Sequence, residues 1–130
     1  MERATTTQTT AHQTGYEAIV ASIATHTHDF GKPVLLINGD SHVYRSDNPL
    51  QQGAPCEIDP GSGSPAVACS NDDWLQHPYY DVRNFHRIVV HGSTFPLEYL
   101  RLTIATDDHG HNAPSGPDSF GPFSWQRVIP

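Results

Sequence analysis

A carboxylate and an imidazole stand two residues apart directly after an apolar run. The run is "VLLI", residues 34–37, and soon after it the sequence reads Gly39-Asp40-Ser41-His42. Glycine permits a sharp backbone turn, so side chains around it can converge at the end of a strand, where open α/β sheets generally bind ligands. Carboxylate and imidazole ligands suit Mn, Fe or Zn. Asp40 and His42 are therefore candidate metal ligands, although an Asp in such a turn also commonly bonds to backbone amides.

Two residues that follow this motif are candidates for contact with a substrate. Arg45 carries a planar guanidinium that can hold a phosphate through two parallel hydrogen bonds, and Tyr44 precedes it directly. A local contact between Arg45 and Asp47 is the alternative, and the sequence does not decide between them. Tyr44 and Arg45 are thus predicted as substrate-binding residues, while the sequence identifies no catalytic residue.

Hydrophobic spacing predicts the elements that must position the motif. Apolar residues recur at helical spacing from Thr14, which with Glu17 fits a capping box, to a stop at Gly31. Residues 34–37 indicate a strand covered on both faces. Two alternating apolar runs in residues 84–105 predict an antiparallel pair, and "PFSWQRVIP" at the end predicts an edge strand. The expected fold class is α/β, with one amphipathic helix packed on a mixed, largely antiparallel sheet of about four strands.

Length predicts one domain behind a polar lead. The chain has 130 residues, the size of an ordinary single domain. Residues 1–13 are Thr-rich without periodicity, so we expect them to be disordered, and residues 14–130 to form the domain. Two loops are expected inside it, one over residues 48–81, long enough to suggest a functional role, and a Gly-, Pro- and His-rich one over residues 107–121.

The charge balance argues against two classes of partner. Seven Lys and Arg face 14 Asp and Glu, and a net charge of -7 repels a phosphate backbone, so nucleic acid is not expected as a general partner. No apolar run approaches the roughly 18 residues of a membrane span, and the start lacks the apolar segment of a signal peptide. We therefore expect no membrane association.

The two cysteines, Cys56 and Cys69, share one stretch rich in Pro, Gly and Ser. A disulfide there would stabilise the domain by roughly 3 kcal/mol in the chain-entropy model and would indicate an oxidising compartment. Two unpaired thiols are the alternative, whereas a zinc site would need two more soft ligands. We expect the disulfide, and with it an exported protein, which is compatible with the missing signal peptide if the chain is cut from a longer parent.

The flanks of the motif carry a resemblance to a known family. The segments "GKPVLLINGDSHVYRSDNPL" and "YDVRNFHRIVVHGSTFPLEYLRLTIA" resemble the C-terminal part of bacterial calcineurin-like metallophosphoesterases, in a subgroup whose last metal motif reads Gly-Asp-x-His. The resemblance implies a two-layer β-sandwich flanked by helices and two metal ions that activate water for attack on a phosphate ester. Gly39 matches the motif glycine, Asp40 stands where the wider family has a metal-binding His, and His42 matches the second motif His.

The resemblance also implies that the site is incomplete in this chain. Only 38 residues precede Gly39, and the family's earlier motifs, Asp-x-His, Gly-Asp-x-x-Asp and Gly-Asn-His-Asp/Glu, are not among them. We therefore expect the C-terminal portion of a phosphoesterase, with His42 and Asp40 in a site completed by a complementary N-terminal half or by homodimerisation. The alternative is a non-catalytic binding or interaction module with a vestigial metal motif, whose exposed apolar face would seek a partner.

Overall fold

The structure is a computed structural model that describes residues 16–39, 42–61, 64–69, 80–92, 97–106 and 114–130. Residues 1–13, the expected polar lead, lie outside these ranges. Within them, no helix is long and apolar enough to cross a membrane. The elements in chain order are helix α2 (Glu17–Phe30) and strands β1 (Val34–Asn38), β2 (Tyr44–Asp47), β3 (Glu57–Asp59), β4 (Val67–Ala68), β5 (Phe85–Val89), β6 (Tyr99–Ile104), β7 (Ser119–Phe120) and β8 (Phe123–Val128).

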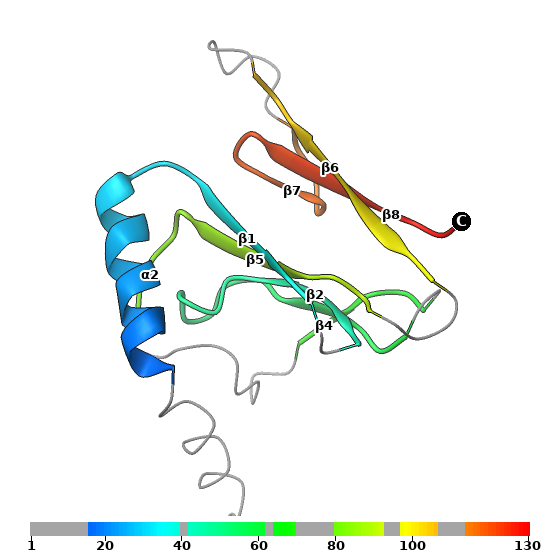
Figure 1. The fold of residues 1–130 in the computed structure, drawn as a ribbon, viewed down its shortest axis with the longest axis horizontal. Helices are drawn as coiled ribbons and strands as arrows, with labels where there is room; N and C mark the ends of the chain where they lie inside the picture. The colour runs from blue at the N-terminus through cyan, green and yellow to red at the C-terminus, as the bar shows by residue number, and fades with distance from the viewer. Residues whose placement is uncertain (1–15, 40–41, 62–63, 70–79, 93–96, 107–113) are drawn as a thin grey trace, which may run out of the picture.

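The strands form two sheets (Figure 1). The larger sheet has the order β1-β5-β2-β3-β4, and the smaller has the order β6-β8-β7. Only β1 and β5 run parallel among the paired strands of the described residues, and all other pairs are antiparallel. The expected α/β class with a mixed, largely antiparallel sheet is therefore confirmed, although the larger sheet has five strands and a second sheet is present.

Strand β5 is central because its side chains serve both faces of the larger sheet. Phe85 packs with Ala24 of α2 and with Leu50 and Val82 in one buried cluster. Ile88, three residues further along, points to the other face and packs with Tyr44 and with Trp125 of the smaller sheet in a second cluster. The helix thus covers one face of the five-stranded sheet, and the three-stranded sheet covers the other.

Helix α2 ends where the sequence predicts. Gly31 adopts a left-handed conformation with φ of 67°, and its N–H donates to the carbonyl of Thr27 at 3.3 Å, as in a glycine C-cap. The predicted start is wrong, because Glu17 is the first helical residue rather than the third, and Tyr16 in the N-cap position provides no side-chain cap. Thr14, the other half of the expected capping box, lies outside the described residues.

The expected antiparallel pairing within residues 84–105 is wrong. Strand β5 lies between β1 and β2, whereas β6 pairs with β8, with Leu102 opposite Trp125. The C-terminal segment is a strand, as expected, but it is the central strand of its sheet and not an edge. Alternating hydrophobicity marks a strand and its two faces, and it leaves the choice of partner to packing between distant segments.

Strand β1 is also placed differently from the expectation. It is an edge strand of the larger sheet in the described part of the chain, and its last three residues are exposed. Leu36 keeps 37% and Ile37 keeps 41% of its surface accessible. An apolar run of four residues does not by itself distinguish a strand covered on both faces from an apolar edge strand.

Both expected loops contain short strands. Residues 48–81 include β3 and β4, which pair antiparallel with Glu57 opposite Ala68. The next pair along is Cys56 and Cys69, whose Cα atoms are 5.2 Å apart and whose sulfur atoms form a disulfide, so the predicted pairing is confirmed. Residues 107–121 include β7 at their end. The disulfide links the residue before β3 to the residue after β4, and so holds the two-residue strand β4 against β3.

Candidate functional site

The site predicted around the Gly-Asp-x-His motif lies at the carboxyl ends of β1 and β5. The pairing continues one residue past the end of β5, because the N–H of Val90 donates to the carbonyl of Asn38, the last residue of β1, at 2.7 Å. Gly39 follows β1 directly, and Val90, His91 and Gly92 follow β5. Both strands therefore deliver their following residues to one edge of the sheet, which is where open α/β sheets generally bind ligands.

His42 is in a conformation that few non-glycine residues adopt. Its φ is 58°, in the left-handed region, and no other described non-glycine residue has a positive φ. Its Nδ1 lies 3.5 Å from the carbonyl oxygen of Gly92, a long contact that joins the motif to the end of the β5 segment. Such conformations cluster at ligand sites, where the surrounding structure enforces them.

The chemistry of His42 fits a metal ligand. In the tautomer that donates from Nδ1 to a backbone carbonyl, Nε2 carries the lone pair that a metal needs, and the second ring nitrogen of metal-binding histidines usually donates to a carboxylate, a backbone carbonyl or water. Asp40, the second predicted ligand, lies outside the described residues. Within the described ranges no group of three or more His, Cys, Asp and Glu side chains is close enough to hold an ion. A complete dinuclear site would therefore need donors beyond this part of the chain.

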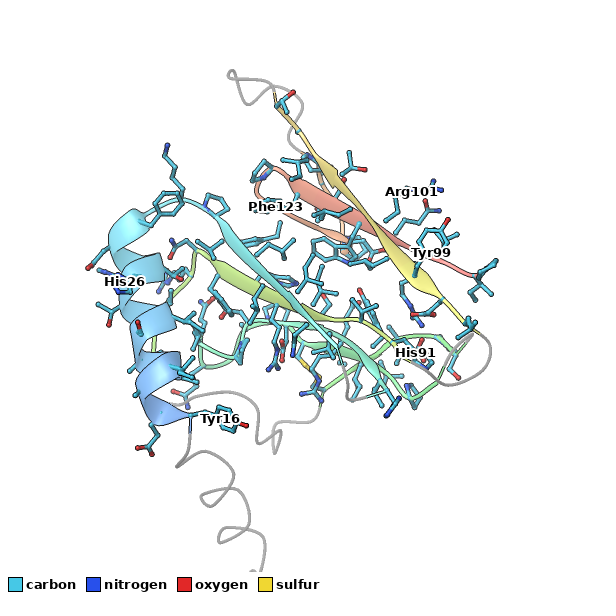
Figure 2. All side chains as sticks on the ribbon, viewed as in Figure 1. Tyr16, His26, His91, Tyr99, Arg101 and Phe123 are labelled. Carbon is cyan, nitrogen blue, oxygen red and sulfur yellow. A yellow bond between two sulfur atoms is a disulfide. The ribbon has the colours of Figure 1, made fainter. Side chains whose placement is uncertain are left out.

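A second histidine lies beside the motif. His91 is the second residue after β5, between Val90 and Gly92, and keeps only 4% of its surface exposed. Figure 2 shows His91 toward the end of the molecule opposite His26, which lies on the helix. The carboxyl end of the parallel pair thus carries two histidines from distant parts of the sequence, of which His42 is exposed and His91 is buried.

Tyr44, a predicted substrate-binding residue, lies in the core between the sheets. It keeps 2% of its surface exposed, and its hydroxyl accepts a hydrogen bond from Nε1 of Trp125 at 3.0 Å. The guanidinium of Arg127 lies 4.4 Å from the centre of its ring. Burial raises the pKa of Tyr44, although the bond from Trp125 opposes this rise. The side chain ties the two sheets together, and its role in substrate binding stays a prediction.

Arg45, the other predicted substrate-binding residue, is buried beside an acidic group. Its Nη1 lies 3.9 Å from Oδ2 of Asp47, which is the local contact given above as the alternative. Asp47 is fully buried and accepts two shorter bonds from Arg87, at 2.8 and 2.6 Å. Arg87 is therefore the main counter-ion of Asp47, and substrate binding by Arg45 stays a prediction.

A second buried charge cluster joins the two sheets. Arg127 of β8 donates to both carboxylate oxygens of Glu98, at 3.0 and 2.9 Å, and forms an ion pair with Asp59 of β3. Although burial lowers the pKa of Arg127, its bonds to Glu98 and Asp59 raise it above the usual value. The side chain of Asp59 is fully buried and that of Glu98 nearly so, which makes this cluster part of the core.

Sequence reasoning also missed a polar pair in this interface. Oγ of Ser46 lies 2.8 Å from Nε2 of His86, and the His86 ring stacks against Phe120 and Trp125, each with centroids 5.3 Å away. Burial lowers the pKa of His86; the charge of Asp47 opposes that shift. A serine beside a neutral imidazole resembles an activated nucleophile, but Ser46 is 5% exposed under aromatic rings, so the pair is a core hydrogen bond.

The signal for this pair was present in the strand alternation. Ser46 shares a face of β2 with Tyr44, and His86 shares a face of β5 with Ile88, so all four point toward the smaller sheet.

Comparison of the chain with models of protein families, with curated proteins and with solved structures finds no match. The resemblance to metallophosphoesterases therefore stays a prediction.

Proposed function

We propose that this chain is the C-terminal portion of a metal-dependent phosphoesterase, and that His42 and Asp40 are its contribution to a divalent metal site. The observation that carries the proposal is the strained His42, held in the left-handed region at the carboxyl ends of the parallel β1–β5 pair. A strained residue at the place where open sheets bind ligands is a functional candidate on physical grounds. The order Gly39-Asp40-Ser41-His42 supports the same interpretation through the family resemblance.

The residues would have distinct roles. His42 would bind Mn, Fe or Zn through Nε2 while Nδ1 faces the carbonyl of Gly92, which orients the ring. Asp40 would supply a carboxylate oxygen. A divalent ion at such a site supplies positive charge that stabilises the phosphate oxygens during hydrolysis of a phosphate mono- or diester. The remaining ligands would come from a complementary N-terminal half or from a second copy, so we expect little or no turnover by the isolated chain.

Calorimetric titration of the metal-stripped chain with Mn²⁺ and with Zn²⁺ tests this proposal. We expect micromolar or tighter binding that is lost in His42→Ala. Hydrolysis of an aryl phosphodiester is followed in the same samples, and any turnover should also depend on His42. The matched control is His26→Ala, because His26 is an exposed histidine on the helix, away from the motif (Figure 2). Binding that is absent, or that His42→Ala leaves unchanged, would contradict the proposal.

A non-catalytic binding module is the second candidate function. One observation favours it: Tyr44 and Arg45, the predicted contacts to substrate, are both buried by other parts of the domain. In this case the metal motif is vestigial and the chain folds equally well without metal. Thermal unfolding with EDTA and with added Mn²⁺ separates the two candidates, because a ligand that binds only the folded state raises the midpoint.

A further inference from the structure

The outer edge of β1 lacks the features that usually protect an edge strand. Sheet edges are commonly blunted by charged residues, by bulges or by very short strands. In the larger sheet the opposite edge strand, β4, has two residues, and in the smaller sheet the edge strand β6 carries Arg101. Strand β1 has five residues and none of them is charged. Of the features that protect an edge, it has only a proline, Pro33, immediately before it. It is the described edge most suited to accepting another strand.

The backbone hydrogen bonds fix which groups point outward. The N–H of Val34 donates to Asn84 at 2.8 Å, and the carbonyl of Asn38 accepts from Val90, so both residues turn their polar groups toward the β5 side. Because these groups alternate along a strand, those of Leu36 also point to β5, and those of Leu35 and Ile37 point to the open edge. Two N–H and two carbonyl groups are thus presented outward.

We propose that β1 is a self-association surface, and that two copies of this chain pair through antiparallel β1 strands into one continuous ten-stranded sheet. The register follows from the outward groups. Leu35 of one copy lies opposite Ile37 of the other, and both residues exchange hydrogen bonds, while the two Leu36 residues meet on the two-fold axis. Shifting the centre to residue 35 would place Pro33, which has no N–H, opposite Ile37 and lose a bond.

The charge distribution around β1 suits a second copy in this antiparallel arrangement. The chain carries a net charge of -7, yet residues 33–39 are uncharged, so the pairing brings no like charges together along the strand. It also keeps the two Lys32 residues, one before each strand, at opposite ends of the paired strands. A parallel arrangement would instead bring the two Lys32 residues together. The proposal does not depend on the metal site.

Sedimentation velocity and hydrogen exchange on the full chain test the proposal. We expect a species of twice the 14.3 kDa chain mass that dissociates on dilution. Exchange at the amides of Leu35 and Ile37 should slow at least tenfold as the concentration rises, whereas the amide of Val34, which already bonds to Asn84, should change little. A monomer over the whole concentration range, or exchange at Leu35 and Ile37 that ignores concentration, would overturn the proposal.

Proline variants separate pairing from folding. Ile37→Pro removes an outward N–H and leaves the bonds to β5 in place, so it should abolish the dimer while circular dichroism shows a folded monomer. Leu36→Lys places two positive charges next to each other on the two-fold axis, so it should also abolish the dimer. This second variant keeps the test valid if the proline variant fails to fold. The control is Ala68→Pro on β4, whose N–H also points outward, since the neighbouring Cys69 N–H bonds to Cys56. A dimer that survives both β1 variants, or that Ala68→Pro abolishes equally, refutes the β1 interface.

Discussion

The interface between the sheets and the carboxyl end of β1 use polar and apolar residues in opposite ways. In the interface, Arg127, Glu98 and Asp59 are charged residues taken out of water and paired with one another. At the end of β1, Leu36 and Ile37 are apolar residues left in contact with water. The charges of the interface are thus paired within the chain, whereas the apolar residues at the end of β1 are not covered by the described fold.

This difference shows where function can be sought. A buried charge cannot leave its partner without a large loss of stability, so the charged residues of the interface are constrained by folding. The end of β1 has no such constraint, and it also carries the strained His42. A residue type suited to phosphate binding, such as Arg, is therefore weak evidence for a site when the same side chain neutralises a buried carboxylate.

Removing the central charge of the interface should have the largest effect. Arg127→Met leaves the carboxylates of Asp59 and Glu98 buried without their counter-ion, and we expect a loss of about 3–5 kcal/mol in the free energy of unfolding. Urea denaturation measures it. Arg101→Met, at an exposed position of β6, is the matched control and should change stability by less than about 0.5 kcal/mol. Equal losses for the two variants would show that the cluster does not hold the sheets together.

Acid should weaken the interface through His86. Its pKa is lower in the folded protein than the ordinary value of 6.5, because burial disfavours the charged ring. The unfolded chain therefore binds the proton first, so stability is complete above about pH 6.5 and falls below it, by up to about 1.4 kcal/mol per pH unit. Unfolding in urea between pH 7.5 and 5 measures this slope. His86→Gln, which does not titrate, should flatten it, and an unchanged slope in that variant would assign the effect to another group.

Removal of one methyl group from an isoleucine in each region gives the most direct comparison of their stability. Ile37 and Ile88 are register partners on neighbouring strands, and Ile88 is fully buried while Ile37 is 41% exposed. Ile88→Val should cost about 1 kcal/mol, and Ile37→Val less than about 0.5 kcal/mol. Urea unfolding at low protein concentration, where the proposed dimer dissociates, measures both. An equal cost would mean that Ile37 is covered in the monomer, which would break the comparison.

Local patterns in the sequence predicted local structure well. Helical spacing and Gly31 located the end of α2, apolar runs located β1 and β5, and the clustered cysteines predicted the disulfide. Each of these features depends on residues near one another in the chain. The predicted partner of β5 was wrong, since β5 pairs with β1 and β2, which precede it by about 40 residues or more. Strand pairing depends on which distant faces bury each other, and alternation leaves that choice open.

The roles of polar residues were decided by tertiary structure. The sequence alone determined that Asp40 and His42 follow an apolar strand across a glycine, which is enough to predict a metal motif. It did not determine that Tyr44 bonds to Trp125, or that Ser46 bonds to His86, because each pair joins positions at least 40 residues apart. A polar side chain has the same identity whether it faces water or a buried partner. Only the packing of the two sheets decides which of these applies.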